Sequence, residues 1–376
     1  MNGDAAVVQW AERKAELGHA GMSGLAVALK VDLDEPKSDV VLKPADATAV
    51  EFYSRPLRAI LQGDITELCV NGPGEVWVES RAGWERRPLP ELTYETLRHV
   101  TELITNSSSQ KISEKTPLVS TSLPTPTRER IQLVIPPAVL AKQISLTIRK
   151  PSDQRFSLAD YRRQGAFEGL RVQSSGLTDV ECELKSFLKY GEYERFFELA
   201  VRSKRNMAFS GVTGSGKTTF MKTCVDLIPS DERLLTIEDA PEMDIVNQPN
   251  HVRLFYSKGG QGVAQVTPRS LLEATLRMKP DRVLLAELRS DEAFEYMRNI
   301  NAHPGSITSL HAASTRLALE QLILLIRQSE TGKGMERKDV MDLVYMLVDV
   351  IVQFDKKKLV GVWYDPDRKY RIMDAL

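Results

Sequence analysis

The stretch GVTGSGKT, Gly211 to Thr218, has the residue types and spacing needed to hold a phosphate. It fits the pattern G-x-x-x-x-G-K-[ST] at every fixed position, with a predicted strand before it and a predicted helix after it. The glycines let backbone N–H groups converge on phosphate oxygens, Lys217 neutralises the β- and γ-phosphates, and the Thr218 hydroxyl ligates Mg²⁺. The predicted contact residues of this P-loop are Gly211, Thr213, Gly214, Ser215, Gly216, Lys217, Thr218 and Thr219.

Two acidic stretches follow the P-loop along the chain. LLTIEDAPEM places Glu238, Asp239 and Glu242 at the end of a predicted strand, and RVLLAELR places Glu287 at the end of another. Ligands of open α/β sheets gather at this carboxyl edge. A carboxylate there could accept a proton from an attacking water or orient Mg²⁺ or its water. Each stretch alone also fits an ordinary strand end; the preceding P-loop favours chemistry.

Two of the five histidines lie close together in NINAHPGSITSLHAAS, at His303 and His311. At a sheet edge they could sense the γ-phosphate or contact a neighbouring subunit. A metal site is not predicted for this pair, because no third ligand lies nearby in the sequence.

Three arginines, Arg128, Arg130 and Arg149, lie in RERIQLVIPP and ISLTIRKPS. Taken alone, this pattern indicates surface charge on strands.

The pattern of elements predicts an α/β fold in several parts. Residues 1–46 form an extension, 47–150 a smaller α+β domain, 151–195 a connector and 196–376 a P-loop domain with a mostly parallel sheet. A hairpin is predicted around GPG, and Thr267 with Pro268 predicts the start of a helix. The chain closes on a hairpin within VDVIVQFDKKKLVGVWYD.

Composition narrows the function classes. The 376 residues carry a formal net charge of −1, so no global positive charge indicates nucleic acid. The three cysteines form no CxxC pair, which argues against a structural zinc site. The sequence shows neither signal-peptide order nor an apolar run of membrane-spanning length, so we expect a cytoplasmic protein.

Together, GVTGSGKTT, TIEDAPEM, TLRMKPDRVLLAELR and AHPGSITSLHA resemble the boxes of the traffic ATPases of the secretion superfamily. These are RecA-like hexameric motors of type II and type IV secretion and of type IV pili. Within the superfamily, the chain resembles the type IV secretion and conjugation branch. This resemblance lies in the stretches RERIQLVIPPA, ISLTIRKPS and FSLADYRRQGAF and in a long connector. The resemblance covers about residues 47–365; Ala286 and Ala302 replace glycines that are usual in the family.

The resemblance implies roles for individual residues. Glu242 would be the catalytic acid, with Glu238 second, and Glu287 would hold Mg²⁺ through water beside Thr218. His303 and His311 would report the state of the nucleotide. Arg130 and Arg149 would approach the γ-phosphate as arginine-finger-like groups, with ATP bound between the two domains of one subunit.

The implied function is a homohexamer that hydrolyses ATP to energise substrate transfer and pilus assembly in bacterial type IV secretion or conjugation. It would act at the cytoplasmic face of the inner membrane, peripherally attached, with inner-membrane and coupling components as partners. A nucleic-acid motor is a weaker alternative, because no basic-aromatic stacking motif is present and no specific nucleic acid is predicted. A non-enzymatic scaffold and a small-molecule kinase are weaker still.

Overall fold

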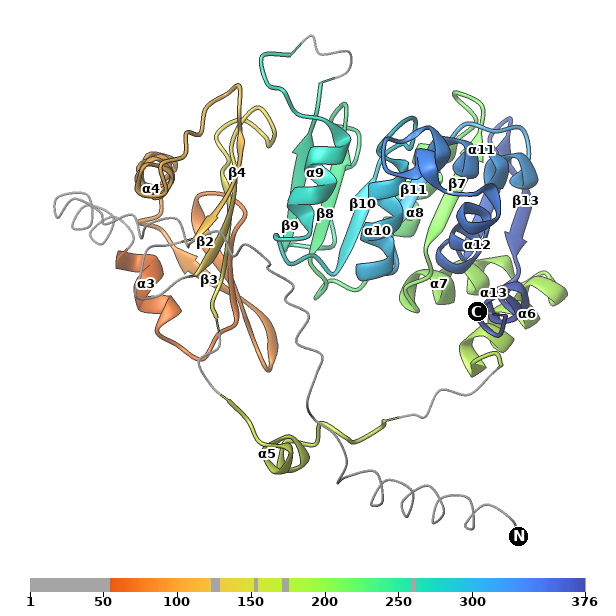
Figure 1. Ribbon diagram of the computed structural model, residues 1–376, viewed down its shortest axis with the longest axis horizontal. Helices are drawn as coiled ribbons and strands as arrows, with labels where there is room; N and C mark the ends of the chain where they lie inside the picture. The colour runs from red at the N-terminus through yellow and green to blue at the C-terminus, as the bar shows by residue number, and fades with distance from the viewer. Residues whose placement is uncertain (1–54, 123–128, 152–154, 171–175, 258–261, 376) are drawn as a thin grey trace, which may run out of the picture. The chain divides into compact units, whose positions relative to one another are not determined.

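The computed structural model describes residues 55–122, 129–151, 155–170, 176–257 and 262–375. All of them belong to one compact unit that contains two separate sheets (Figure 1). The predicted extension 1–46 and Arg128 lie outside the described residues. The predicted domain boundaries remain predictions, since contacts join the two sheets within that unit.

The first sheet is antiparallel, with strand order β3-β2-β1-β6-β5-β4. Its strands are β1 (Glu67–Val70), β2 (Gly74–Ser80), β3 (Gly83–Leu89), β4 (Leu118–Ser122), β5 (Arg130–Val134) and β6 (Ser145–Arg149). Helices α3 (Arg55–Leu61) and α4 (Tyr94–Ser107) supply buried leucines and isoleucine to the same apolar core as the strands. The predicted hairpin around GPG is confirmed by the pairing of β1 with β2. Strand β3 was not predicted, because its sequence GWERRPL lacks the alternation of apolar residues that is typical of a strand. Most of its residues are exposed in the structure.

The connecting region contains three helices, α5 (Leu158–Arg163), α6 (Asp179–Tyr190) and α7 (Tyr193–Arg202). Ser157 caps α5, and Thr178 caps α6 in the same reciprocal manner with Glu181 at the third helical position. The capping pattern therefore fixes where both helices begin.

The second sheet has the strand order β13-β12-β7-β11-β10-β8-β9. Six of its strands run parallel, and only β13 is antiparallel to its neighbour. The strands are β7 (Met207–Gly211), β8 (Leu234–Glu238), β9 (His251–Phe255), β10 (Arg282–Leu285), β11 (Ile307–Leu310), β12 (Val350–Asp355) and β13 (Lys358–Tyr364). The intervening helices are α8 (Lys217–Asp226), α9 (Pro268–Thr275), α10 (Ala293–Ala302), α11 (Thr315–Gln328) and α12 (Arg337–Leu347), and α13 (Pro366–Met373) follows the last strand.

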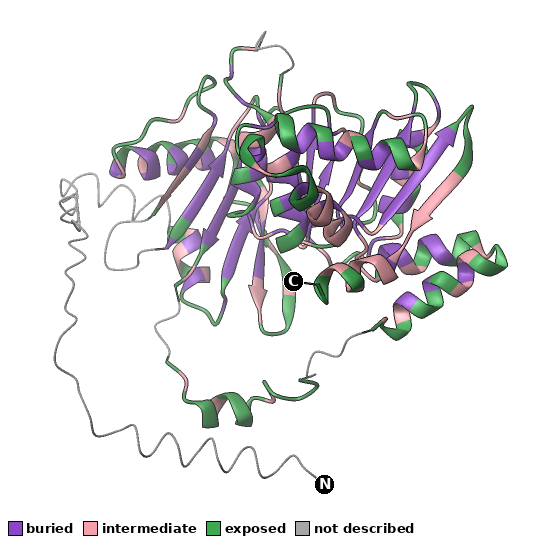
Figure 2. Cartoon of the chain, turned by 45° about the vertical axis from the view of Figure 1, so that its right-hand side comes forward, coloured by how far each residue is buried: buried purple, intermediate pink, exposed green. Residues whose placement is uncertain are grey.

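Helices cover both faces of this sheet, and the burial view shows the strands buried between half-exposed helices (Figure 2). Successive strand residues point to opposite faces. Leu235 thus packs with α9–α12 in one core cluster, while Leu234 packs with α6–α8 in the other. The α/β prediction, with a mostly parallel sheet and a second α+β part, is confirmed.

The two sheets meet beside β8 and β9. The carbonyl of Ala138 accepts from the backbone N–H of Phe255 at 2.9 Å. Fully buried Arg233 donates to Asn71 at 2.7 Å, and Lys279 pairs with Glu79 at 2.7 Å. Arg233 and Lys279 precede β8 and β10, so these polar contacts lie at the amino ends of the parallel strands.

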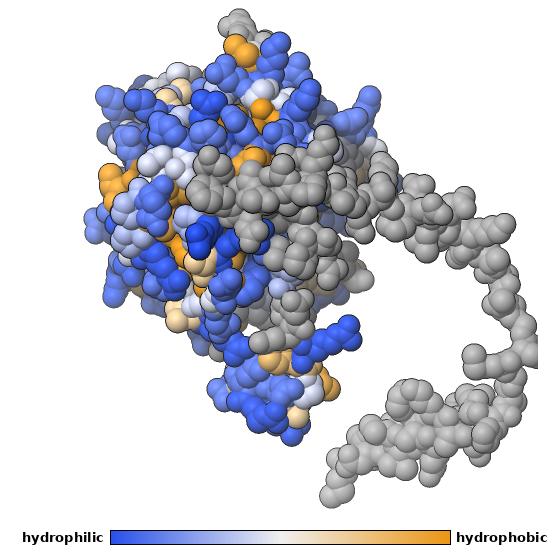
Figure 3. All heavy atoms as spheres, turned by 90° about the vertical axis from the view of Figure 1, so that its left-hand side faces the viewer, coloured by the Kyte–Doolittle hydropathy of each residue, from blue (hydrophilic) through white to orange (hydrophobic). Residues whose placement is uncertain are grey.

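The described surface in Figure 3 is mostly hydrophilic with scattered apolar residues. Among the described residues, no helix combines the length and apolar character needed to cross a membrane.

Burial of Glu67 on β1 makes the stability of the fold depend on pH. Burial raises the pKa of Glu67 from 4.5 to about 7, although Arg149, 3.4 Å away, opposes the shift. A raised pKa means that the folded state holds the proton more tightly than the unfolded state does. The contribution of Glu67 is therefore fully present below the unfolded pKa and is lost as pH rises toward about 7.

We expect Glu67→Gln to remove this loss, so that the variant gains stability relative to the parent as pH rises from about 4.5 to about 7. Denaturant midpoints measured across this range test it. Glu102→Gln, on the exposed Arg98 ion pair of α4, is the control and should keep the parent slope. Parallel curves for the parent and Glu67→Gln would contradict the prediction.

Candidate active site

The P-loop lies between β7 and α8, at the carboxyl edge of the parallel sheet. Gly211 has φ +152°, and a Cβ there would lie 2.6 Å from the carbonyl oxygen of Phe354 on β12. Gly216 has φ +100° and stands at the N-cap of α8. Lys217 is buried, and its ammonium donates to the carbonyls of Gly211 at 2.6 Å and Val212 at 3.1 Å. The loop is thus compact and glycine-dependent, with its single buried cation held at the centre.

His311 links the P-loop to the acid after β10. Its Nδ1 lies 3.0 Å from the carbonyl oxygen of Gly211 and 3.5 Å from the ammonium of Lys217. Its Nε2 lies 3.0 Å from Oε1 of Glu287. A neutral imidazole can donate from only one of its nitrogens, so it can serve only one of these two acceptors at a time. The ring is therefore placed to respond to changes at either the loop or the acid.

Glu287 is held as a carboxylate by surrounding cations. Burial alone raises its pKa, but the hydrogen bond and charge of Arg289, together with the charge of Lys217, bring the pKa below its usual value. Lys217 has a lowered pKa because burial outweighs the attraction of Glu287. The site therefore keeps a cation and an anion close together at one edge of the sheet.

The acidic stretch that begins at the end of β8 contains two kinds of carboxylate, one buried and one exposed. Glu238 is fully buried; it accepts from Thr236 at 2.5 Å and from the backbone N–H groups of Glu242 and Met243 at 3.0 and 2.8 Å. Arg253 donates to both of its oxygens at 3.0 and 2.9 Å. The side chain of Glu242 is exposed instead. The prediction of Glu238 as a second catalytic acid is corrected: its oxygens are occupied, and it positions the backbone that carries Glu242.

Arg289 joins the two acidic stretches, and sequence reasoning missed this role. It donates to Asp239 at 3.0 Å and makes a short hydrogen bond to Glu287, and these contacts raise the pKa of its guanidinium. The sequence feature that could have indicated this role is the position of Arg289, two residues after Glu287. The fixed fork of an arginine suits such a bridge between two carboxylates.

His303 does not lie beside His311. It follows α10 and precedes β11, whereas His311 follows β11, so the two rings stand at opposite ends of one strand. Burial lowers the pKa of His303, as does the charge of Lys279, a residue of the amino-end contact between the sheets. The prediction that His303 binds the nucleotide with His311 is wrong for a single subunit.

Arg130 and Arg149 also lie away from the P-loop of their own chain. They are exposed and face each other across the β5–β6 pairing. Arg149 pairs with Glu67, whose pKa is affected by Lys279 and Arg233 at the amino end of the parallel sheet. Arg233 and Lys279 precede β8 and β10, so this contact lies at the amino ends of the parallel strands, whereas the P-loop follows the carboxyl end of β7. The expectation that these arginines reach ATP within one subunit is therefore corrected.

Comparison with known proteins gives the family. A family model described as "Type II/IV secretion system protein" matches residues 53–352. The chain belongs to this family.

Individual relatives of this secretion-family protein agree along most of their length. Type IV secretion system protein VirB11 of Bartonella quintana (strain Toulouse) is 42% identical over 334 residues, 84% of this chain and 93% of that protein. The protein of the same name from Brucella suis biovar 1 (strain 1330) is 43% identical over 335 residues, covering 86% and 92%.

A solved structure extends the match to three dimensions. The crystal structure of the VirB11 ATPase from the Brucella suis type IV secretion system in complex with sulphate has a TM-score of 0.82 at 42% identity, and the match covers 88% of this chain and 98% of that one. The prediction of a traffic ATPase of type IV secretion is thus confirmed.

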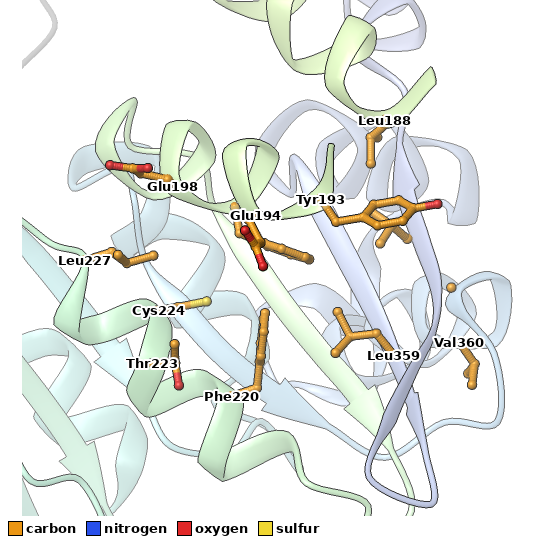
Figure 4. A pocket seen from close by; sticks show the side chains of 13 residues that line it. Leu188, Tyr193, Glu194, Glu198, Phe220, Thr223, Cys224, Leu227, Leu359 and Val360 are labelled. Atoms are coloured by element: carbon orange, nitrogen blue, oxygen red, sulfur yellow. The ribbon is translucent and has the colours of Figure 1, made fainter. Parts of the chain in front are cut away.

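A cavity of about 790 Å³ lies on another side of α8. Figure 4 shows Glu194 and Glu198 of α7 across from Thr223 and Cys224 of α8 and from Leu227, which directly follows α8. Burial raises the pKa of the Cys224 thiol to about 12, so the thiol stays protonated. The lining is mostly apolar and includes none of the predicted phosphate contacts of this secretion-family protein, so the cavity is not the phosphate site.

We expect Arg289→Met to lower kcat for ATP hydrolysis by about 10-fold, because Glu287 and Asp239 lose the group that orients them together. Arg289→Lys should restore only part of the rate, since a lysine cannot reproduce the two-carboxylate fork. Steady-state turnover and separately measured ATP affinity test this. Arg98→Met on α4, which removes an exposed ion pair with Glu102, is the control. Equal kcat for parent and Arg289→Met would exclude the role.

Proposed function

We propose that this chain is the subunit of a homohexameric motor that hydrolyses ATP to energise substrate transfer and pilus assembly in type IV secretion or conjugation. It would work peripherally at the cytoplasmic face of the inner membrane, with inner-membrane and coupling components of the channel as partners. The observation that carries the proposal is the convergence of Lys217, His311 and Glu287 at the carboxyl edge of the sheet. The family membership and the similarity to the Brucella ATPase support it.

The proposed nucleotide contacts follow from the geometry. Lys217 would exchange its two carbonyl acceptors for phosphate oxygens, which bind a cation more strongly. The exposed P-loop residues Thr213, Gly214, Thr218 and Thr219 and the buried Ser215 complete the loop. The Thr218 hydroxyl and the Glu287 carboxylate fit the hard oxygen ligands of Mg²⁺, with Glu287 acting through water. Bound Mg²⁺ would neutralise the charge that develops on the phosphates.

Glu242 is the proposed proton acceptor for the attacking water. Its side chain is exposed, while its backbone N–H is fixed by buried Glu238 at 3.0 Å. A free carboxylate on an anchored backbone suits a general base. His311 would then report phosphate release, because movement of the Gly211 carbonyl changes which acceptor its ring serves.

Arg130 and Arg149 are proposed to complete the site of a neighbouring subunit. The place of Arg149 near Arg233 and Lys279, at the amino ends of the parallel strands, argues against a role in their own subunit, whereas ring assembly brings one chain's surface against the next. An arginine supplied in this way stabilises transition-state charge and couples chemistry to the movement of subunits.

Lys217→Ala should reduce ATP hydrolysis to background, whereas Glu242→Gln should keep ATP affinity within about twofold and lower kcat by about 10²- to 10⁴-fold. Titration calorimetry and steady-state hydrolysis separate the two effects. Glu238→Gln serves as the contrast: it should lower the thermal midpoint, because it breaks a buried network, while Glu242→Gln should not. Unchanged turnover in Lys217→Ala would defeat the proposed ATPase site.

Mixing two inactive variants tests the arginines. One carries Lys217→Ala, and the other carries Arg130→Ala with Arg149→Ala. If the arginines act on the neighbour's nucleotide, mixed rings contain complete sites and regain a measurable part of parent turnover. Absence of recovery, in mixtures whose exchange of subunits has been verified by mass, would place the arginines outside the chemistry or within their own subunit's site.

A further inference from the structure

The hairpin between β12 and β13 turns on two lysines in a disfavoured conformation. Asp355 pairs with Lys358, so Lys356 and Lys357 form a two-residue turn with φ of 45° and 64°. Positive φ at both positions is the signature of a type I′ turn, which favours Asn-Gly because side chains there are strained. Lys356 and Lys357 therefore both adopt a backbone conformation that residues with a side chain disfavour.

This turn rests directly on the P-loop. The backbone N–H of Lys357 donates to the carbonyl of Ser215 at 3.0 Å. A Cβ placed on Gly216 would lie 3.4 Å from the Cα of Lys357 and 3.8 Å from its Cβ. The end of β12 also presses on the loop, since a Cβ on Gly211 would meet the Phe354 carbonyl at 2.6 Å. Three independent approaches thus fix the hairpin against the phosphate-binding loop.

The turn also concentrates positive charge. Lys356, Lys357 and Lys358 are exposed beside a single acid, Asp355. Within the described ranges, no ion pair or side-chain hydrogen bond engages any of the three ammonium groups. By contrast, the other cation of this loop, Lys217, is buried and bonded. A Cβ placed on Gly216 would lie 4.0 Å from Cγ of Lys357, so this lysine stem begins beside the loop that would hold the phosphates, and charges this near are screened little at a Debye length of about 10 Å.

We propose that the Lys356–Lys358 turn is a second cationic part of the nucleotide site and binds the polyphosphate of ATP from outside the P-loop. The inference rests on the proposed ATP site and adds ligands to it. The backbone bond to Ser215 holds the turn in place, and the flexible lysine stems deliver the charge. Electrostatic attraction to a triphosphate accounts for charged side chains at positions where Asn-Gly would relax the backbone.

Two variants of the turn separate charge from backbone geometry. Lys356→Asn with Lys357→Gly removes two charges and supplies the preferred turn residues. Lys356→Gln with Lys357→Gln removes the same charges and keeps the strain. Lys142→Gly is the matched control, because Lys142 is another exposed lysine with positive φ, 62°, in the connection between β5 and β6.

ATP dissociation constants at low and high salt, together with thermal midpoints, give the answer. Both turn variants should bind ATP about 3- to 10-fold more weakly at low salt, and the difference should shrink at high salt. The Asn-Gly variant should also melt at a higher temperature than the Gln-Gln variant, and Lys142→Gly should bind ATP like the parent.

The outcomes distinguish this inference from the proposed function. If the parent binds ATP and both turn variants bind it equally well, the turn is only a structural support and the inference fails. Weakening in only one of the two variants would assign the effect to turn geometry and also overturn it. If the parent itself fails to bind ATP, the proposed function fails instead.

Discussion

The parallel alignment of β7, β8, β10 and β11 is the constraint on which the site depends. Parallel strands end at one edge, so whatever follows each strand is brought to the same side of the sheet. The site draws on segments spread over a hundred residues of sequence, yet each part lies at or just after the end of a strand: the P-loop, Glu238, Glu287 and His311. Cores on both faces of the sheet hold these strand ends in place.

The carboxylates at this edge of the sheet differ in how deeply they are buried. Glu238 has no free oxygen, because half-buried Arg253 and two backbone N–H groups engage it, whereas Glu242 is exposed on the segment that Glu238 anchors. Arg289 then connects this segment to Glu287. A change at the P-loop can reach the acidic stretch through His311, Glu287 and Arg289, which are linked by direct contacts.

The amino ends of the parallel strands contact the antiparallel sheet. Arg233 and Lys279 join the antiparallel sheet to the amino ends of the parallel strands, and His303 lies near Lys279. The strand β11 therefore runs from this contact, next to His303, to the nucleotide edge at His311. Its position offers a direct physical connection between phosphate chemistry and the neighbouring sheet, as a motor requires.

The sequence alone determined the P-loop, the order of strands and helices after it, the closing hairpin and the family, because these depend on local spacing and on residue types that follow one another along the chain. It also predicted Glu242 and Glu287 as site residues from their places near strand ends, and their roles stay predictions. Only the tertiary structure separated Glu238 from Glu242, revealed Arg289, moved His303 to the far end of β11 and removed Arg130 and Arg149 from their own P-loop. Each of these depends on strand order and side-chain burial, which are set by packing between distant segments and leave no local pattern to read.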